Sequence, residues 1–156
     1  ASTGTVRDIT SERAQQLEIQ LTDLPRLYAE ADFITFHPPL TAETRHMIGR
    51  RELASMKPTA ILVNTARGAI VDQRALYEAL RDRVIAAAAI DVAEVEPVPP
   101  DDPLLTLDNL ILTPHVASAS VATRTRMAVQ AAQNLLAGLR GEPMPHCVNP
   151  QVLQRG

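Results

Sequence analysis

Ala60-Ile61-Leu62-Val63-Asn64-Thr65-Ala66-Arg67-Gly68 is the stretch that decides the fold of this chain. Its first half is a continuous apolar run of strand length, which is typical of a parallel strand buried on both faces. Its second half turns polar, and Gly68 indicates a tight turn that directs the Arg67 side chain. The stretch therefore predicts a buried strand that ends at a functional loop.

Short apolar runs and helical patterns alternate on both sides of this strand. Further strands are predicted at residues 18–21, 33–36, 84–92 and 110–112. Helices are predicted after a cap at Thr22 or Asp23, at residues 50–56, at 73–82 behind an Asp72 cap, and from about Ser120 to Arg140. Such alternation forms βαβ units with right-handed crossovers, so the predicted fold class is α/β with a parallel sheet and flanking helices.

Composition narrows the possible functions. A chain of 156 residues suggests one domain, and its formal net charge of −3 argues against nucleic-acid or membrane partners, which favour a basic face. Aromatic residues make up only 3% of the chain, which argues against base-stacking surfaces. The single cysteine, Cys147, cannot form an internal disulfide. We therefore expect a cytoplasmic protein with neither a nucleic-acid nor a membrane partner.

Four polar clusters each follow directly on a predicted strand. They are His37-Pro38-Pro39-Leu40-Thr41, Asn64-Thr65-Ala66-Arg67-Gly68, Asp91 with Glu96 five positions on, and Thr113-Pro114-His115. In open α/β sheets, ligands bind outside the carboxyl ends of the strands. The four clusters are therefore predicted to meet in one crevice.

Each charged side chain in these clusters also has a structural interpretation. Arg67 could be a solvated loop arginine, Glu96 a surface carboxylate, and His115 a structural loop histidine. Asp91 ends a very apolar strand, where a carboxylate is costly unless it is paired or faces a crevice. Together the set favours catalysis, because an arginine can bind a substrate carboxylate at two points and a carboxylate-oriented histidine can exchange a proton with a carbinol oxygen. These groups suit hydride transfer on a 2-hydroxy or 2-oxo acid, which requires a nicotinamide cofactor.

Three blocks of sequence carry a family resemblance. They are Ala31-Asp32-Phe33-Ile34-Thr35-Phe36-His37 leading into Pro39-Leu40-Thr41 and Thr44, then Met56-Lys57-Pro58 through Val63-Asn64-Thr65-Ala66-Arg67-Gly68 to Val71-Asp72, and Ala89-Ile90-Asp91-Val92 with Glu96-Pro97 and Asp108 to His115. They resemble blocks of the D-2-hydroxyacid dehydrogenase family, which includes phosphoglycerate dehydrogenases and glyoxylate/hydroxypyruvate reductases. The resemblance extends from about Ser11 to Pro150.

The resemblance implies roles for individual residues. Arg67 would hold the substrate carboxylate, His115 would be the acid/base, and Glu96 would be its partner. Asp91 would hydrogen-bond the nicotinamide carboxamide. The remaining implied cofactor contacts, beside Arg67 and His115 themselves, are Pro38, Pro39, Thr44, Thr65, Ala66, Ala117 and Ser118. The implied cofactor is NAD or NADP, with NAD favoured, and no metal ligand is assigned.

The chain departs from the family pattern because it contains no G-x-G-x-x-G fingerprint. The family carries this pyrophosphate-binding motif on its first βαβ unit, which we expect upstream of residue 1. We accordingly expect residues 1–150 to form the C-terminal part of an NAD(P)-binding domain, a partial Rossmann-like doubly wound sheet without its first βαβ unit. Residues 151–156 would be a tail, the substrate domain would be absent, and Asp8 would be the candidate for the adenine ribose.

These departures leave two functional hypotheses open. In the first, the chain is part of a dehydrogenase or reductase of 2-hydroxy or 2-oxo acids that forms a homodimer at full length, and the chain alone is inactive. In the second, it is a catalytically inactive dinucleotide-fold fragment, or a regulatory or oligomerising module. Retention of Arg67, Glu96 and His115 favours the first hypothesis.

Overall fold

The computed structural model describes residues 2–4 and 11–151, in two compact units. The first unit ends at His115 and the second begins at Val116. The predicted parallel α/β fold is confirmed in the first unit, which contains a four-stranded parallel sheet and the helices that connect its strands. No helix within the described ranges is long and apolar enough to span a membrane.

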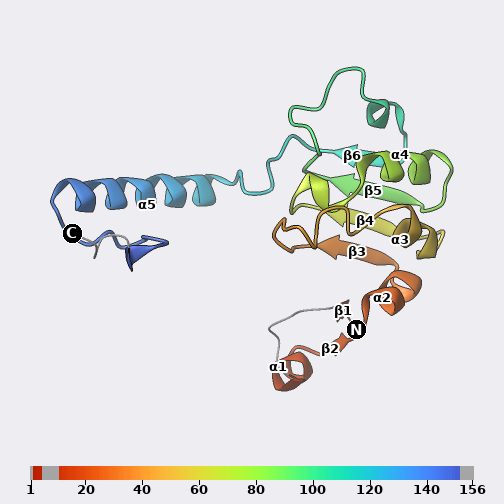
Figure 1. Cartoon of the computed structure of the whole chain (residues 1–156), viewed down its shortest axis with the longest axis horizontal. Helices are drawn as coiled ribbons and strands as arrows, with labels where there is room; N and C mark the ends of the chain where they lie inside the picture. Colours follow the sequence, from red (N-terminus) through yellow and green to blue (C-terminus); the bar gives the residue numbers. More distant parts are fainter. Residues whose placement is uncertain (1, 5–10, 152–156) are drawn as a thin grey trace. The chain divides into compact units, whose positions relative to one another are not determined.

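A four-stranded parallel sheet forms the centre of the first unit, and its strands lie in chain order (Figure 1). The strands are β3 (Phe33–Phe36), β4 (Ile61–Asn64), β5 (Ala87–Ile90) and β6 (Leu110–Leu112). The register aligns Asn64 with both Phe36 and Ile90, and Ile90 with Leu112. The carboxyl ends of all four strands are therefore level at one edge.

Helices connect these strands and begin where the sequence predicts. They are α2 (Leu24–Glu30), α3 (Arg50–Ser55) and α4 (Gln73–Arg81), with short 3-10 helices at Gly68–Ile70 and Pro103–Thr106. The Asp23 side chain caps α2 by accepting from the Arg26 amide, and Asp72 caps α4 by accepting from the Ala75 amide. Of the two caps considered for α2, Asp23 is therefore the correct one.

The core lies on one face of the sheet. Side chains of that face, such as Leu62 and Ile90, share a buried cluster with Leu53 of α3 and Leu76 of α4. The four apolar residues predicted to line one side of α4 are all buried: Ala75, Leu76, Ala79 and Leu80. This packing fixes the sheet against the helices and so fixes the edge at which the polar clusters lie.

The opposite face of the sheet is more exposed, which corrects the prediction that β4 is buried on both faces. Ile61 and Val63 are only half-buried. Phe33 and Ile111 on the neighbouring strands are 73% and 67% exposed. The physical reason is that α3 and α4 both contribute their apolar residues to the core of the other face.

The predicted strand at residues 84–92 is also wrong at its ends. Only Ala87–Ile90 forms the strand β5, although the Ala86 and Asp91 amides on either side still donate to Ala60 and Asn64. Val84 instead donates its amide to the Ala79 carbonyl, and Arg83 has a left-handed φ of 54°. Val84, the first residue of the predicted strand, therefore belongs to the turn that ends α4. Asp91 and Val92 are buried but lie beyond the strand.

The first described residues of the chain form a separate two-stranded parallel sheet. It pairs β1 (Ser2–Gly4) with β2 (Ile19–Leu21), and α1 (Ser11–Gln16) lies between them in the chain. β2 confirms the strand predicted at residues 18–21.

The second unit consists of one long helix and a short tail. α5 (Val121–Leu139) is capped by the Ser120 hydroxyl, which accepts from the Thr123 amide, and ends before Gly141, whose φ of 70° is left-handed. Asn134 bonds the backbone of His146 and so holds the tail against the helix. These bounds confirm the helix predicted from about Ser120 to Arg140.

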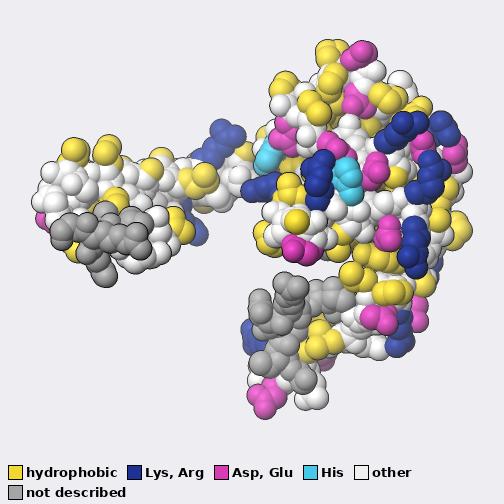
Figure 2. Space-filling view, in the orientation of Figure 1, with side chains coloured by type: hydrophobic (Ala, Val, Ile, Leu, Met, Phe, Trp, Pro, Cys, Tyr) yellow, Lys and Arg dark blue, Asp and Glu magenta, His cyan; other side chains and the backbone are white. Residues whose placement is uncertain are grey.

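Several charged side chains on and next to α3 and α4 lie beside partners of opposite sign. Figure 2 shows Lys and Arg side chains interleaved with Asp and Glu where α3 and α4 lie. The ion pairs in this region are Arg50–Glu78, Arg74–Glu78, Arg81–Asp82 and Arg83–Asp108. Such paired surface charges contribute little to stability and create no field of a single sign.

Candidate active site

The polar clusters that follow β4, β5 and β6 are joined by backbone hydrogen bonds. The Asp91 amide donates to the Asn64 carbonyl at 2.9 Å, and the Thr113 amide donates to the Ile90 carbonyl at 3.0 Å. These bonds extend the parallel register one step beyond the strands. These three clusters therefore lie at one edge of the sheet. The prediction that all four clusters meet in one crevice is not confirmed, because only the clusters after β5 and β6 line the pocket at this edge.

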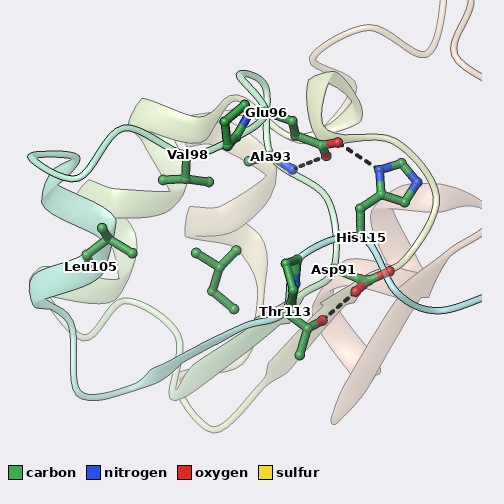
Figure 3. A pocket seen from close by; sticks show the side chains of 10 residues that line it. Asp91, Ala93, Glu96, Val98, Leu105, Thr113 and His115 are labelled. Carbon is green, nitrogen blue, oxygen red and sulfur yellow. Dashed lines mark hydrogen bonds and ion pairs between the residues drawn. The ribbon is translucent and has the colours of Figure 1, made fainter. Parts of the chain in front are cut away.

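A pocket of about 600 Å³ opens beside the ends of β5 and β6 (Figure 3). Its polar residues are Asp91, Glu96, Thr113 and His115. Its apolar lining consists of Ala93, Pro97, Val98, Leu105, Leu112 and Pro114. Ligand pockets in proteins commonly have about 300–1,000 Å³ and combine apolar walls with a few convergent polar groups.

His115 and Glu96 form a hydrogen-bonded pair at this pocket. His115 Nδ1 lies 2.7 Å from Glu96 Oε2, and the Ala93 amide donates to Glu96 Oε1 at 2.9 Å. These bonds, from the His115 ring and then from the Ala93 N–H, hold the pKa of Glu96 below its ordinary value. Both side chains remain partly exposed, so the pair is accessible to a ligand and to solvent.

Asp91 and Thr113 form the second polar pair of the pocket. Asp91 is 5% exposed, and the Thr113 hydroxyl donates to its Oδ1 at 2.5 Å. Thr113 belongs to one of the predicted polar clusters, but the sequence assigns it no role of its own. Its spacing of two from His115 is the available signal, because alternate residues of an extended segment can serve the same side.

The backbone turns sharply at His115. This residue has a φ of 54°, in the left-handed region that is unfavourable for a side chain with a Cβ, and its amide donates to the Thr113 carbonyl at 3.0 Å. Strained backbone of this kind is concentrated at functional sites in proteins. The turn allows the ring of His115 to reach Glu96 across the end of the sheet.

Asn64 organises the turn that follows β4. Its side-chain amide donates to the Arg67 carbonyl at 2.9 Å and its Oδ1 accepts from the Ala66 amide at 3.1 Å. The predicted tight turn is present, because Gly68 begins the short 3-10 helix Gly68–Ile70 and the Ile70 amide donates to the Arg67 carbonyl at 3.2 Å. A close backbone contact gives a second reason for glycine here. A Cβ at Gly68 would lie 2.0 Å from the backbone carbon and oxygen of Ala93, so only glycine permits this contact.

The Arg67 side chain is at the same edge of the sheet but does not line the pocket. It is exposed, and its Nη1 donates to the carbonyl of Ala66 at 2.6 Å. Thr65 is also exposed and Ala66 is half-buried. The structure thus brings Asp91, Glu96 and His115 together around the pocket and leaves Arg67 outside it.

The loop after β3 is stabilised by its own hydrogen bonds. The Thr44 hydroxyl donates to the Pro39 carbonyl at 2.7 Å and accepts from the Thr41 amide at 2.8 Å. Pro38 is half-buried in this loop. These residues lie next to the end of β4 in the strand order, but none of them lines the pocket.

The remaining predicted residues are Ala117, Ser118 and Asp8, and none of them is part of the described first unit. Ala117 and Ser118 belong to the second unit, immediately after His115 in the chain. Asp8 lies outside the described residues. Their contribution to a cofactor site stays a prediction.

The fold and the pocket define a parallel α/β domain with its ligand crevice at the carboxyl edge of the sheet. Residues 3–117 match the model of the D-isomer specific 2-hydroxyacid dehydrogenase, NAD binding domain. The chain belongs to this family, as the sequence motifs predicted.

Known relatives agree with this assignment. The chain is 54% identical over 140 residues to a glyoxylate reductase of Korarchaeum cryptofilum, a match that covers 90% of the chain and 42% of the relative. It is 50% identical over 143 residues to glyoxylate/hydroxypyruvate reductase B of Enterobacter agglomerans, covering 92% and 44%. The crystal structure of D-lactate dehydrogenase with NAD+ from Lactobacillus jensenii superposes with a TM-score of 0.81 at 32% identity, covering 94% of the chain and 47% of that structure. The chain thus spans less than half the length of these relatives.

Proposed function

We propose that this chain supplies the acid/base and nicotinamide-binding groups of an NAD(H)-dependent D-2-hydroxyacid dehydrogenase that reduces 2-oxo acids. The observation that carries the proposal is the His115–Glu96 pair at a ligand-sized pocket, in a member of this family. Reduction of the ketone adds a hydride to C2 and a proton to the oxygen, giving the 2-hydroxy acid and NAD+.

His115 is the proton donor in this proposal. Because Nδ1 is bonded to Glu96, Nε2 remains for the substrate oxygen. Glu96 orients the ring, and its lowered pKa keeps it ionised near neutral pH, where it stabilises the protonated imidazole before transfer. In the reverse reaction the same nitrogen accepts the proton of the 2-hydroxy group.

The residues around the pocket fit a nicotinamide cofactor. The apolar walls suit a flat ring, and Asp91, held by Thr113, offers a carboxyl oxygen to the N–H groups of a carboxamide. When bound, the cofactor supplies the hydride. We propose NAD(H) rather than NADP(H), which agrees with the NAD-binding family and the NAD+-bound structural relative.

Arg67 is proposed to bind the substrate carboxylate. Its guanidinium carries five N–H donors in a planar fork that matches a carboxylate at two points. The side chain is exposed and bonded to the Ala66 carbonyl, so binding would exchange this hydrogen bond for two charge-assisted ones. Arg67 would thereby turn from the surface toward the His115 side of the edge.

A non-catalytic assembly module is the second candidate. It is favoured by one observation, the exposed apolar face of the sheet that carries Phe33 and Ile111. Such a face is typical of a surface that another protein element covers. This candidate predicts association of chains and no turnover.

A chimera tests the two candidates. The chain replaces the 140 matching residues of the Korarchaeum glyoxylate reductase, and NADH oxidation is measured with glyoxylate and with hydroxypyruvate. We expect turnover on the order of 1 s⁻¹ or faster with at least one acid. Glyoxylamide, the matched control, lacks the carboxylate that Arg67 would bind and should react far more slowly.

The chimera also contains its own check on folding. Circular dichroism and NADH binding by calorimetry establish that it is folded and binds cofactor before turnover is assayed. A folded, NADH-binding chimera that reduces neither acid would refute the dehydrogenase proposal and leave the assembly module.

A further inference from the structure

Gln73 and Glu94 form a reciprocal hydrogen-bonded pair outside the pocket. The Gln73 amide donates to Glu94 Oε1 at 2.9 Å, and the Glu94 amide donates to Gln73 Oε1 at 2.9 Å. Each residue therefore binds the backbone of the other with its side chain. The pair joins the first residue of α4 to the loop that follows β5.

Two further contacts tighten this pair. His46 Nε2 lies 3.0 Å from the same Glu94 Oε1, and Gln73 Nε2 donates to Asp102 at 2.9 Å. Asp102 in turn caps the short helix Pro103–Thr106 by accepting from the Leu104 amide. Gln73 and Glu94 thus join α4, the loop after β5, the His46 segment and the short helix that Asp102 caps. The Glu94 side chain is 25% exposed.

The pair lies between the two parts of the candidate active site. Glu94 is adjacent to Ala93, whose amide donates to Glu96 and whose backbone contacts Gly68 beside Arg67. The segment from residue 93 to residue 96 therefore touches the Arg67 turn on one side and holds the partner of His115 on the other. Neither Gln73 nor Glu94 lines the pocket.

We propose that Glu94, through its reciprocal bonds with Gln73, is a positioning residue that holds the segment 93–96 against the Arg67 turn and so fixes Glu96 for His115. The catalytic consequence rests on the proposed function; the positioning itself does not. Glu94 acts through Ala93 and Glu96 and contacts neither substrate nor cofactor.

The direct test uses the full 156-residue chain and no assay of turnover. The pKa of Glu96 is measured by NMR titration of its side-chain carbon in the parent chain and in Glu94→Ala. If the pair positions Glu96, the variant weakens its bonds to His115 and Ala93, and the pKa of Glu96 rises toward the ordinary value. Loss of a nearby negative charge alone would lower this pKa, so the two causes have opposite signs.

Matched variants separate positioning from general damage. Glu78→Ala removes a glutamate of α4 that pairs with Arg50 and Arg74, and should leave the pKa of Glu96 unchanged. Glu94→Gln retains an oxygen for the Gln73 amide but loses the charge, so the pKa of Glu96 should lie at or slightly below the parent value and should not rise. Gln73→Ala removes the same pair from the other side, serves if Glu94→Ala does not fold, and should again raise it. An unchanged or lowered pKa of Glu96 in the folded Glu94→Ala or Gln73→Ala variant would overturn the proposal.

The catalytic consequence is measured in the chimera described above. Glu94→Ala should lower kcat by about tenfold to a hundredfold with an unchanged KM for NADH, because a misplacement of about 1 Å can cost a hundredfold. Glu94→Gln should recover most of the rate. An inactive parent chimera would count against the proposed function, whereas a Glu94→Ala variant as fast as an active parent would count against positioning.

Discussion

Asp91 and Glu96 are two carboxyl groups five residues apart, and the same turn after β6 binds both. Thr113 donates to Asp91, and His115 bonds Glu96. Their surroundings differ, because Asp91 is 5% exposed and the Glu96 side chain is 38% exposed. Asp91 directly follows a buried strand, whereas Glu96 lies on a loop.

The difference shows how two carboxyl groups at one edge of a sheet can perform two different tasks. A buried carboxyl group with fixed partners is suited to holding an uncharged donor in one orientation. A partly exposed carboxylate bonded to a histidine is suited to steps in which charge and protons change. We therefore expect substitutions around Glu96 to affect rate and those around Asp91 to affect stability.

The largest effect is expected for His115→Ala in the chimera. Removal of a general acid/base typically costs about 10²–10⁴ in rate, so kcat should fall by that factor while NADH affinity is retained. His146→Ala, which changes an exposed histidine of the second unit, is the matched control. A His115→Ala variant with near-parent kcat would show that the His115–Glu96 pair has no role in proton transfer.

Glu96→Gln should have the next largest effect on rate and little effect on stability. A hydrogen bond to a charged group is worth about 1.5–3 kcal/mol, which corresponds to a loss of about tenfold to a hundredfold in kcat. The free energy of unfolding should change by less than about 0.5 kcal/mol, as for other surface substitutions. Urea unfolding and steady-state kinetics on the same preparation would measure both, and a stability loss without a rate loss would reverse our assignment.

Thr113→Val should show the opposite pattern on the Asp91 side. The buried Asp91 loses one of its partners, which should lower the free energy of unfolding by about 1–3 kcal/mol. Thr106→Val is the control, because the Thr106 hydroxyl is exposed and donates only to the Pro103 carbonyl. Equal losses in the two variants would mean that burial at Asp91 carries no special weight.

The smallest effect is expected from pH. The pKa of Glu96 is lowered in the folded chain, so its stabilising contribution is complete above the ordinary glutamate value and is lost as pH falls through the lowered value. The NMR midpoint of Glu96 should therefore lie below that of a free glutamate. In His115→Ala the midpoint should rise, and an unchanged midpoint would show that the His115 bond is not its main cause.

Elements with local signals could be predicted from the sequence alone. The strand at Phe33–Phe36, the cap at Asp72 and the buried face of α4 depend on neighbours within a turn or two of chain. Burial depends on more distant elements, which is why the second face of β4 was predicted wrongly. An apolar run also does not specify strand pairing, since Val84 continues the C-terminal turn of α4.

The candidate site divides in the same way. Asp91, Glu96 and His115 could be placed at one edge because parallel strands end together. The Glu96–His115 pair follows from the family resemblance, but Thr113–Asp91 and Gln73–Glu94 could not be predicted, since they join residues more than twenty positions apart. The second reason for Gly68 is likewise a contact with Ala93, and the orientation of Arg67 depends on packing that no local pattern encodes.

The turn at Thr113, Pro114 and His115 has a consequence for how chain length can vary here. Because residues two apart bind the two carboxyl groups, inserting one residue between them would change their spacing, so that Thr113 and His115 could no longer both keep their partners. We expect an inserted glycine there to abolish NADH oxidation by the chimera. The same insertion within residues 99–101, an exposed turn that does not line the pocket beside β5 and β6, should be tolerated. The length of this turn therefore sets the positions of the two groups that bind Asp91 and Glu96.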